Sequence, residues 1–254
     1  MRPFISGIVI VKNEEARIGR CLESMHWLDE IVVVDSGSTD GTREICTHYD
    51  KVRFFSHEWE GFGRQKNIAL QAAVGEWVLS VDADELVTSE LVAEIDRVLQ
   101  SPKCDGYYIQ RKNFYRGKWI RHSGWWPDPV LRLFRRDKGR FSDRMVHESV
   151  ELEGTAGYLK AALEHHSFAT VTDFIKKADD YSTLGALMLM QHGRRASASL
   201  ALLKSFAAFV KTLVVKRGFL DGFSGVLIAY SNATGVFYRY MKCVELRQRG
   251  ASEP

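Results

Sequence analysis

Trp77-Val78-Leu79-Ser80-Val81-Asp82-Ala83-Asp84 is a short apolar run that ends in two carboxylates. The apolar part is typical of a buried strand, and both aspartates would stand where that strand ends. Similar apolar runs begin near Ile8, Ile31 and Val52, with helical or polar stretches between them. This spacing predicts repeated βα units around a parallel sheet, and therefore an α/β fold.

The flanking segments agree with this fold class. Residues 8–11 and 31–34 are continuous and rich in β-branched side chains, as in strands that are covered on both faces. Apolar side chains at helical spacing predict helices over 18–25 and over 91–99, the latter after a capping signal at Thr88. From residue 106 to residue 134 the pattern predicts short strands or hairpins that complete a mixed sheet, and beyond Val171 it predicts long helices.

Composition sets wider limits. Of 254 residues, 45% are hydrophobic and 26% are charged, which excludes disordered, collagen-like and coiled-coil chains. The four cysteines lie far apart without C-x-x-C spacing, so we expect reduced cytosolic thiols rather than a zinc knuckle or a disulfide framework. The amino terminus lacks the apolar core of a signal peptide, and export is not expected.

The net charge of +3 is unevenly distributed. Residues 194–254 contain ten Lys or Arg and three acidic residues, a net charge of +7 that leaves −4 for residues 1–193. Phenylalanines are interleaved with these basic residues, and the uncharged run 222–238 has only 17 residues, near the lower limit for a membrane span. We expect this segment to associate with an anionic membrane surface; the alternatives are a packing element with a solvated basic face and, less favoured, a nucleic-acid surface.

Polar clusters follow three of the expected strands, at residues 12–15, 35–42 and 82–85. Each cluster alone would be read as a solvated turn or a helix cap. Ligands bind beyond the carboxyl ends of the strands in open parallel sheets, so the three clusters together predict a binding site. Asp82 and Asp84 offer the hard oxygen ligands that suit Mg²⁺ or Mn²⁺, and such an ion would neutralise a diphosphate leaving group. The dinucleotide and P-loop glycine motifs are absent from the sequence.

Four ordered motifs carry a resemblance to a known family. Residues 8–15, 30–42, 61–70 and 79–85 resemble glycosyltransferase family 2, which implies the Rossmann-like GT-A fold of nucleotide-diphospho-sugar transferases. Residues 124–136, 146–148 and 218–222 are similar to the bacterial lipopolysaccharide core β-1,4-glucosyltransferase group. The narrower resemblance implies inverting transfer of a sugar, glucose from UDP-glucose, to inner-core heptose.

The resemblance also implies roles for individual residues. The residues that it places in the nucleotide-sugar pocket are Asn13, Glu14, Asp35, Lys66, Asn67 and Asp82. Within that pocket Asp35 would accept a hydrogen bond from the base. Asp82 and Asp84 would hold the metal, and the family often supplies a histidine from the region of His165.

Inversion at an anomeric carbon by one displacement needs a general base that takes the proton of the acceptor hydroxyl. Glu148 and Asp128 compete for this role, and we favour Glu148 because it fits the position at which the family places its acid. Trp119, Trp125 and Trp126, with Arg121 and His122, would form either an acceptor wall or part of a packed core.

The sequence thus predicts a GT-A domain over residues 1–170 and a helical, basic, membrane-associating segment over 171–254. We expect a metal-dependent inverting hexosyltransferase on the cytoplasmic face of the bacterial inner membrane. It would use a nucleotide-sugar donor and a lipopolysaccharide core acceptor, and no nucleic acid. The alternatives are transfer to another lipid-linked or capsular acceptor, or a protein that binds a nucleotide sugar without catalysis.

Overall fold

The computed structural model describes residues 2–142 and 149–250, which form two compact units. The first unit holds the chain up to Lys112 together with Asp128–His166, and the second holds Asn113–Pro127 and the chain from Ser167 onward. A division near residue 170 is expected from the sequence, but the grouping of Asn113–Pro127 with the late helices is not.

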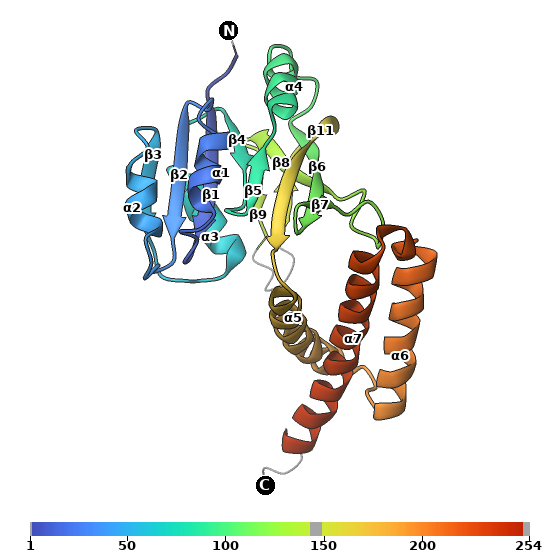
Figure 1. Ribbon diagram of the computed structural model, residues 1–254. Coiled ribbons are helices and arrows are strands. Elements are labelled where there is room, and N and C mark those ends of the chain that lie inside the picture. The colour runs from blue at the N-terminus through green and yellow to red at the C-terminus, as the bar shows by residue number, and fades with distance from the viewer. Residues whose placement is uncertain (1, 143–148, 251–254) are drawn as a thin grey trace. The chain divides into compact units, whose positions relative to one another are not determined.

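A mixed sheet forms the centre of the first unit (Figure 1). Its strands are β1 (Ile5–Val11), β2 (Glu30–Asp35), β3 (Val52–Ser56), β4 (Trp77–Ser80), β5 (Glu85–Val87), β6 (Gly106–Tyr115), β8 (Pro129–Arg135) and β11 (Ala156–Phe168). They are arranged in the order β3-β2-β1-β4-β8-β6-β11-β5. β1 pairs in parallel with β2 and β4, and β2 with β3, whereas β4–β8, β6–β8 and β11–β5 are antiparallel pairs. The expected parallel half and mixed second half are both confirmed.

Helices pack on both faces of the sheet. They are α1 (Ile18–Ser24), α2 (Thr42–Thr47), α3 (Phe62–Ala72) and α4 (Ser89–Leu99). On one face Val9, Val33 and Leu79 pack in the core that contains α1 and α4, and on the other face Ile8 and Val78 pack in the core that contains α3. Successive strand residues alternate between these two cores, which explains why the strand sequences are continuously apolar.

Two further local features belong to the first unit. Thr88 caps α4 as its sequence predicts, because its Oγ1 accepts a hydrogen bond from Leu91 N at 3.2 Å. A separate antiparallel pair, β9 (Gly139–Phe141) and β10 (Val150–Leu152), flanks the stretch 143–148, which lies outside the described residues.

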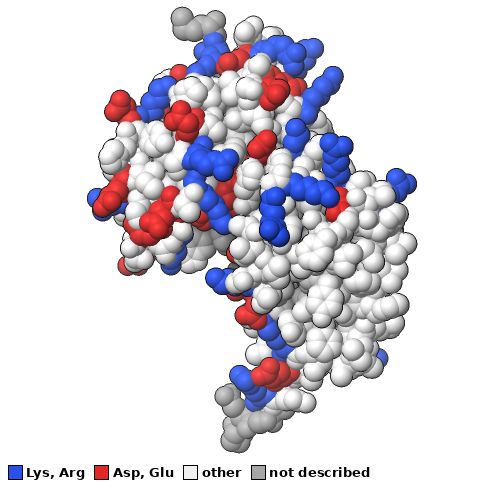
Figure 2. Space-filling view, viewed as in Figure 1, with Lys and Arg blue, Asp and Glu red and all other residues white. Residues whose placement is uncertain are grey.

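The second unit is mostly helical. Its elements are β7 (Lys118–Trp119), α5 (Val171–Gln191), α6 (Ala198–Val210), the π-helical turn η1 (Lys211–Val215), the 3₁₀ turn η2 (Gly218–Asp221) and α7 (Phe223–Gly250). Tyr115, Ile120, Phe174 and Ile228 form its small core. Figure 2 shows a broad area without charged side chains over α6 and α7.

Candidate functional site

The polar clusters of the first unit meet at one edge of the sheet. β1 lies between β2 and β4 and is parallel to both, so the residues after these three strands come together, as the sequence predicts. Two of the connecting loops brace each other: Asn13 Oδ1 accepts a hydrogen bond from Thr39 N at 2.8 Å, and Gly41 N donates to Glu15 Oε2 at 2.8 Å. Asn13 itself has a φ of 56°, a left-handed conformation that asparagine tolerates better than most residues.

Asp35 lies at the end of β2 and is almost completely buried. Its carboxylate accepts hydrogen bonds from Gly37 N at 3.1 Å and from Ser38 N at 3.1 and 3.2 Å, and the Ser38 hydroxyl also donates to it. The side chain therefore shapes the loop after β2. A contact between Asp35 and the base of a nucleotide stays a prediction.

Asn67 forms a reciprocal pair with the backbone of Phe141. Its Nδ2 donates to Phe141 O and its Oδ1 accepts from Phe141 N, both at 2.9 Å. This pair fastens α3 to β9. Asn67 thus has a clear structural role, and its place in a nucleotide pocket stays a prediction.

Lys66 and Arg132 converge on Asp82. Lys66 Nζ lies 2.9 Å from Asp82 Oδ1, and a terminal nitrogen of Arg132 lies 2.5 Å from Asp82 Oδ2. Both cationic side chains are nearly buried, whereas the Asp82 side chain is 30% exposed. Burial alone would raise the pKa of Asp82, but the charges and hydrogen bonds of Arg132 and Lys66 hold it well below its usual range. Asp82 is therefore ionised at neutral pH, and its charge is balanced within the chain.

The ion pairs continue beyond Asp82. Arg132 also lies 2.6 Å from Oε1 of Glu85, which is fully buried, and Arg111 NH1 lies 3.6 Å from the same oxygen. Arg111 in turn pairs with Asp128 at 2.9 Å. Lys66, Asp82, Arg132, Glu85, Arg111 and Asp128 thus form a row of alternating charge, which we call the charge row.

Three members of the charge row, Glu85, Arg111 and Arg132, were assigned no role from the sequence, although Glu85 lies within the polar cluster 82–85. The sequence did contain one signal of a buried ion pair. Arg132 interrupts the apolar run Leu131-Arg132-Leu133-Phe134, and it is buried in β8. A buried arginine needs a carboxylate partner nearby. The sequence alone did not identify that partner.

Asp84 and His165 are a second pair of site residues. His165 Nε2 lies 3.4 Å from Asp84 Oδ2, and both side chains are mostly buried. Antiparallel pairing of β5 with β11 sets His165 opposite Glu85, and His166 N donates to Asp84 O at 2.9 Å. The sheet therefore brings together the carboxylate and the histidine that the family resemblance proposes as metal ligands.

Asp84 and His165 suit a divalent cation. A carboxylate oxygen and an imidazole nitrogen are common ligands of Mn²⁺, while Mg²⁺ usually keeps several waters and takes only one or two protein ligands besides phosphate oxygens. No group of three or more His, Cys, Asp or Glu residues in the described part of the chain is arranged to hold a metal ion. The residues present thus fit a two-ligand site that a diphosphate would complete. Asp82 as a further metal ligand stays a prediction.

Glu14 shares the electrostatic environment of this pair. Burial raises the pKa of Glu14, Arg17 opposes that shift, and the negative charges of Asp84 and Asp40 add to it. A cation held by Asp84 would therefore also favour the ionised form of Glu14.

The two candidate bases differ in what the structure describes. Glu148 lies outside the described residues. Asp128 lies in the first unit, where its Oδ2 accepts hydrogen bonds from Arg111 Nε at 3.0 Å and NH2 at 2.9 Å. Arg111 thus occupies this oxygen of Asp128 within the chain. The choice of Glu148 as the base stays a prediction.

The aromatic residues expected at the acceptor side belong to the second unit. Trp125 stacks on Phe168 and Phe174, with ring centroids 5.2 and 6.1 Å apart, so Trp125 helps to pack this unit. Trp119 contacts Trp126 edge to face, and the Arg121 guanidinium lies 4.4 Å from the Trp119 ring centroid. An acceptor contact of Trp119 or Trp126 stays a prediction.

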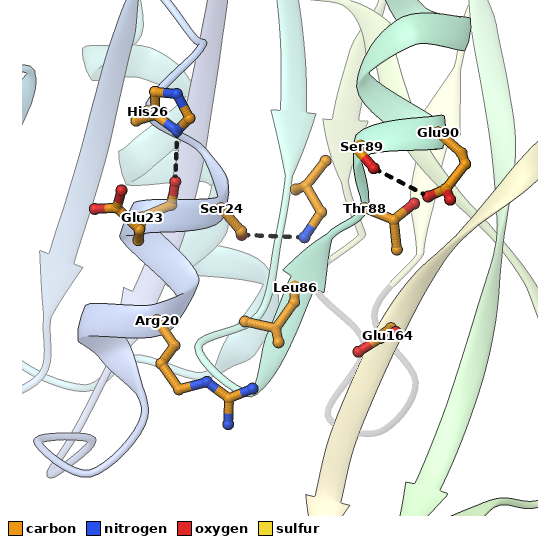
Figure 3. Close-up of a pocket in the computed structure, with 10 residues that line it drawn as sticks. Arg20, Glu23, Ser24, His26, Leu86, Thr88, Ser89, Glu90 and Glu164 are labelled. Atoms are coloured by element: carbon orange, nitrogen blue, oxygen red, sulfur yellow. Dashed lines mark hydrogen bonds between the residues drawn. The ribbon is translucent and has the colours of Figure 1, made fainter.

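A separate hollow of about 540 Å³ lies between α1, β5 and the start of α4 (Figure 3). Arg20, Glu23, Glu90 and Glu164 are among its lining residues, and Ser24 Oγ accepts a hydrogen bond from Val87 N at 3.0 Å there. None of the residues proposed for the nucleotide-sugar or metal site lines it. The site at the strand ends is therefore distinct from this hollow.

Comparison with known proteins decides the family. Residues 6–167, which span the sheet and the charge row, match the sequence profile of glycosyl transferase family 2. This chain belongs to glycosyl transferase family 2. The expected GT-A-like α/β fold with helices after it is confirmed.

Relatives of this glycosyltransferase span nearly its whole length. It is 31% identical over 259 residues to the lipopolysaccharide core biosynthesis glycosyltransferase LpsC of Rhizobium meliloti. The match covers 97% of this chain and 93% of LpsC. It is 30% identical to an uncharacterized glycosyltransferase of Rickettsia typhi, over 96% of this chain and 87% of that protein. The solved mannosyltransferase PcManGT of Pyrobaculum calidifontis, in complex with GDP-Man and Mn²⁺, matches with a TM-score of 0.58 at 17% identity, over 96% of this chain and 88% of that one. That structural match shows a shared fold.

Proposed function

We propose that this glycosyltransferase transfers glucose from UDP-glucose, with inversion and with the help of a divalent cation, to heptose of the lipopolysaccharide inner core. The observation that carries the proposal is the Asp84–His165 pair at 3.4 Å, beside the charge-balanced Asp82, at the edge where β1, β2 and β4 end. A carboxylate and imidazole at that edge are suited to a cation that binds a nucleoside diphosphate. The Mn²⁺ and GDP-Man of PcManGT support the same assignment.

Each part of the site has a task in such a transfer. Asp84 and His165 would hold the ion, whose positive charge favours departure of the diphosphate. Lys66 and Arg132 keep Asp82 ionised and hold its carboxylate in one orientation. Asp82 can then accept hydrogen bonds from hydroxyl groups of the nucleotide sugar. On the acceptor side, Glu148 removes the hydroxyl proton while the acceptor oxygen attacks the anomeric carbon and the bond to the diphosphate breaks.

The acceptor assignment rests on LpsC, whose name places it in lipopolysaccharide core biosynthesis and which aligns with nearly the whole chain. An assay with a panel of nucleotide sugars and truncated lipopolysaccharides tests the donor and the acceptor together. We expect transfer from UDP-glucose to an acceptor that ends in inner-core heptose, with a β-linkage in the product by nuclear magnetic resonance. Transfer only to a polyprenyl phosphate or a capsular intermediate would overturn the acceptor assignment.

A single-turnover measurement of donor hydrolysis separates an enzyme from a protein that only binds a nucleotide sugar. With Mn²⁺ present, the wild-type chain should release the sugar slowly without an acceptor, and Asp84→Asn should not. Tight donor binding without hydrolysis or transfer, over the whole panel, would contradict catalysis.

A further inference from the structure

The second unit exposes many large apolar side chains on α6, η1, η2 and the start of α7. We call it the apolar face, and its most prominent members are Leu202, Leu203, Phe206, Val215, Phe219 and Phe223. Phe206 is 68% exposed, Val215 71% and Phe223 73%. A soluble surface seldom leaves this many large apolar side chains together in water, so the face is suited to an apolar partner.

The segment that carries the apolar face is also positively charged. Residues 194–220 contain six Lys or Arg and no Asp or Glu, and Lys204, Lys211, Lys216 and Arg217 are exposed. Asp221, the next acidic residue, is buried. The surface thus combines apolar side chains with unbalanced positive charge, which is the chemistry that an anionic phospholipid leaflet binds.

The positions of Lys204 and Lys211 favour lipid over protein as the partner. Both lie within Ala198–Val215, a stretch long and apolar enough to cross a membrane by length and composition, of which only 11% is buried. In a dry protein interface these ammonium groups would be buried, and lysine is depleted from such interfaces. At a bilayer their long stems can lie along the apolar chains while the charges reach the phosphates.

The two ends of the α6–α7 hairpin argue against a span. At the turn between the helices, the Asp221 carboxylate accepts hydrogen bonds from Ser123 Oγ at 2.8 Å and from Arg121 N and His122 N at 3.2 Å, and Lys118 Nζ donates to Asp221 O at 3.0 Å. Insertion of this end would carry several polar groups into hydrocarbon.

The opposite end is also polar. There α7 carries Lys242, whose Nζ lies 2.6 Å from Asp179 Oδ1 of α5, and it continues to Arg247 and Arg249. A hydrogen bond also joins α6 to α7 near the middle of the hairpin, where Ser205 Oγ donates to Ala233 O at 2.9 Å. Neither end of the hairpin is suited to the bilayer interior.

We infer that the apolar face lies flat in an anionic phospholipid leaflet, with Phe206 and Phe223 among the acyl chains and the surrounding lysines at the phosphates. The inference goes beyond the proposed transfer, since it involves neither the donor nor the site at the strand ends.

Vesicle co-sedimentation of the full chain tests the inference. Wild type should bind vesicles of phosphatidylcholine with phosphatidylglycerol, and more weakly those of phosphatidylcholine alone. The double variant Phe206→Glu/Phe223→Glu should lower the partition coefficient at least about tenfold, because one buried phenylalanine already contributes about that factor. Ile175→Glu on α5, where Ile175 is 64% exposed outside the apolar face, should leave partition unchanged.

Several outcomes would overturn the inference. Equal partition of the double variant and wild type into vesicles would do so. If wild type is an oligomer, and the double variant loses that oligomer with unchanged vesicle binding, the apolar face is instead a contact between copies of the chain. Wild type that stays in vesicles after alkaline carbonate extraction would contradict the flat orientation. Unchanged circular dichroism and UDP binding in the double variant confirm that it is folded, and keep this test independent of the proposed transfer.

Discussion

His165 Nε2 lies 3.4 Å from Asp84 Oδ2, although the two residues are 81 positions apart in the sequence. Antiparallel pairing of β5 with β11 produces this approach. The pairing of β5 with β11 positions Asp84 and His165, whereas Asp82 follows β4, which pairs in parallel with β1. The site therefore has two structural origins, and they can be perturbed separately.

Asp84→Asn and His165→Ala should each weaken Mn²⁺-dependent binding of UDP by at least about tenfold, since either change removes one of two proposed protein ligands. Titration calorimetry with and without Mn²⁺ measures this. His166→Ala is the control, because His166 pairs with Glu164 instead. Metal-dependent affinity equal to wild type in both ligand variants would disprove the metal assignment.

Glu148→Gln keeps the size of the side chain but cannot accept a proton, so turnover should fall by roughly 10²–10⁴ while UDP binding is retained. Asp128→Asn loses part of an ion pair with Arg111 and should reduce turnover much less. Steady-state rates of both variants decide between the two carboxylates. An active Glu148→Gln enzyme beside an inactive Asp128→Asn enzyme would reverse our ranking.

Arg132→Met should lower the free energy of unfolding by about 3–5 kcal/mol, because it leaves Glu85 buried without its nearest cation. Arg135→Met, on the same strand, removes the partner of Glu76, whose side chain is half exposed, and should change stability by less than about 1 kcal/mol. Urea unfolding of both variants gives the comparison. Equal losses would show that the charge row contributes no more than a surface pair.

The pH dependence of Asp82 has a definite sign. Its pKa is lowered in the folded chain, so its ion pairs stabilise the fold above the usual carboxyl pKa of about 4 and lose that effect as pH falls through the lowered value. Asp82→Asn should therefore be less stable than wild type at neutral pH, and the difference should shrink in acid. Unfolding in chelator-containing buffer at a series of pH values measures it. Asp137→Asn, at an exposed carboxylate, should show a small difference throughout.

Much of the first unit could be predicted because its information is local. Continuous β-branched runs mark strands covered on both faces, and parallel strands bring their carboxyl ends to one edge, so the meeting of the clusters after β1, β2 and β4 follows from the sequence. The family resemblance added His165. Neither signal specifies the order of β8, β6, β11 and β5, and that order sets Arg132 between Asp82 and Glu85. An arginine within an apolar run, such as Arg132, signals that a carboxylate lies nearby, but the local sequence does not say which one.

The membership of Asn113–Pro127 in the second unit has a practical consequence. The chain passes from one unit to the other after Lys112, after Pro127 and after His166, so the helices are not a removable tail. A truncation near residue 170 would remove Asp221, the partner of Ser123, and Phe174, the partner of Trp125. The stretch Asn113–Pro127 would then lack the helices against which it packs. Chimeras that exchange the helical unit between related transferases should therefore carry both stretches together, the inserted loop and the helices it packs with.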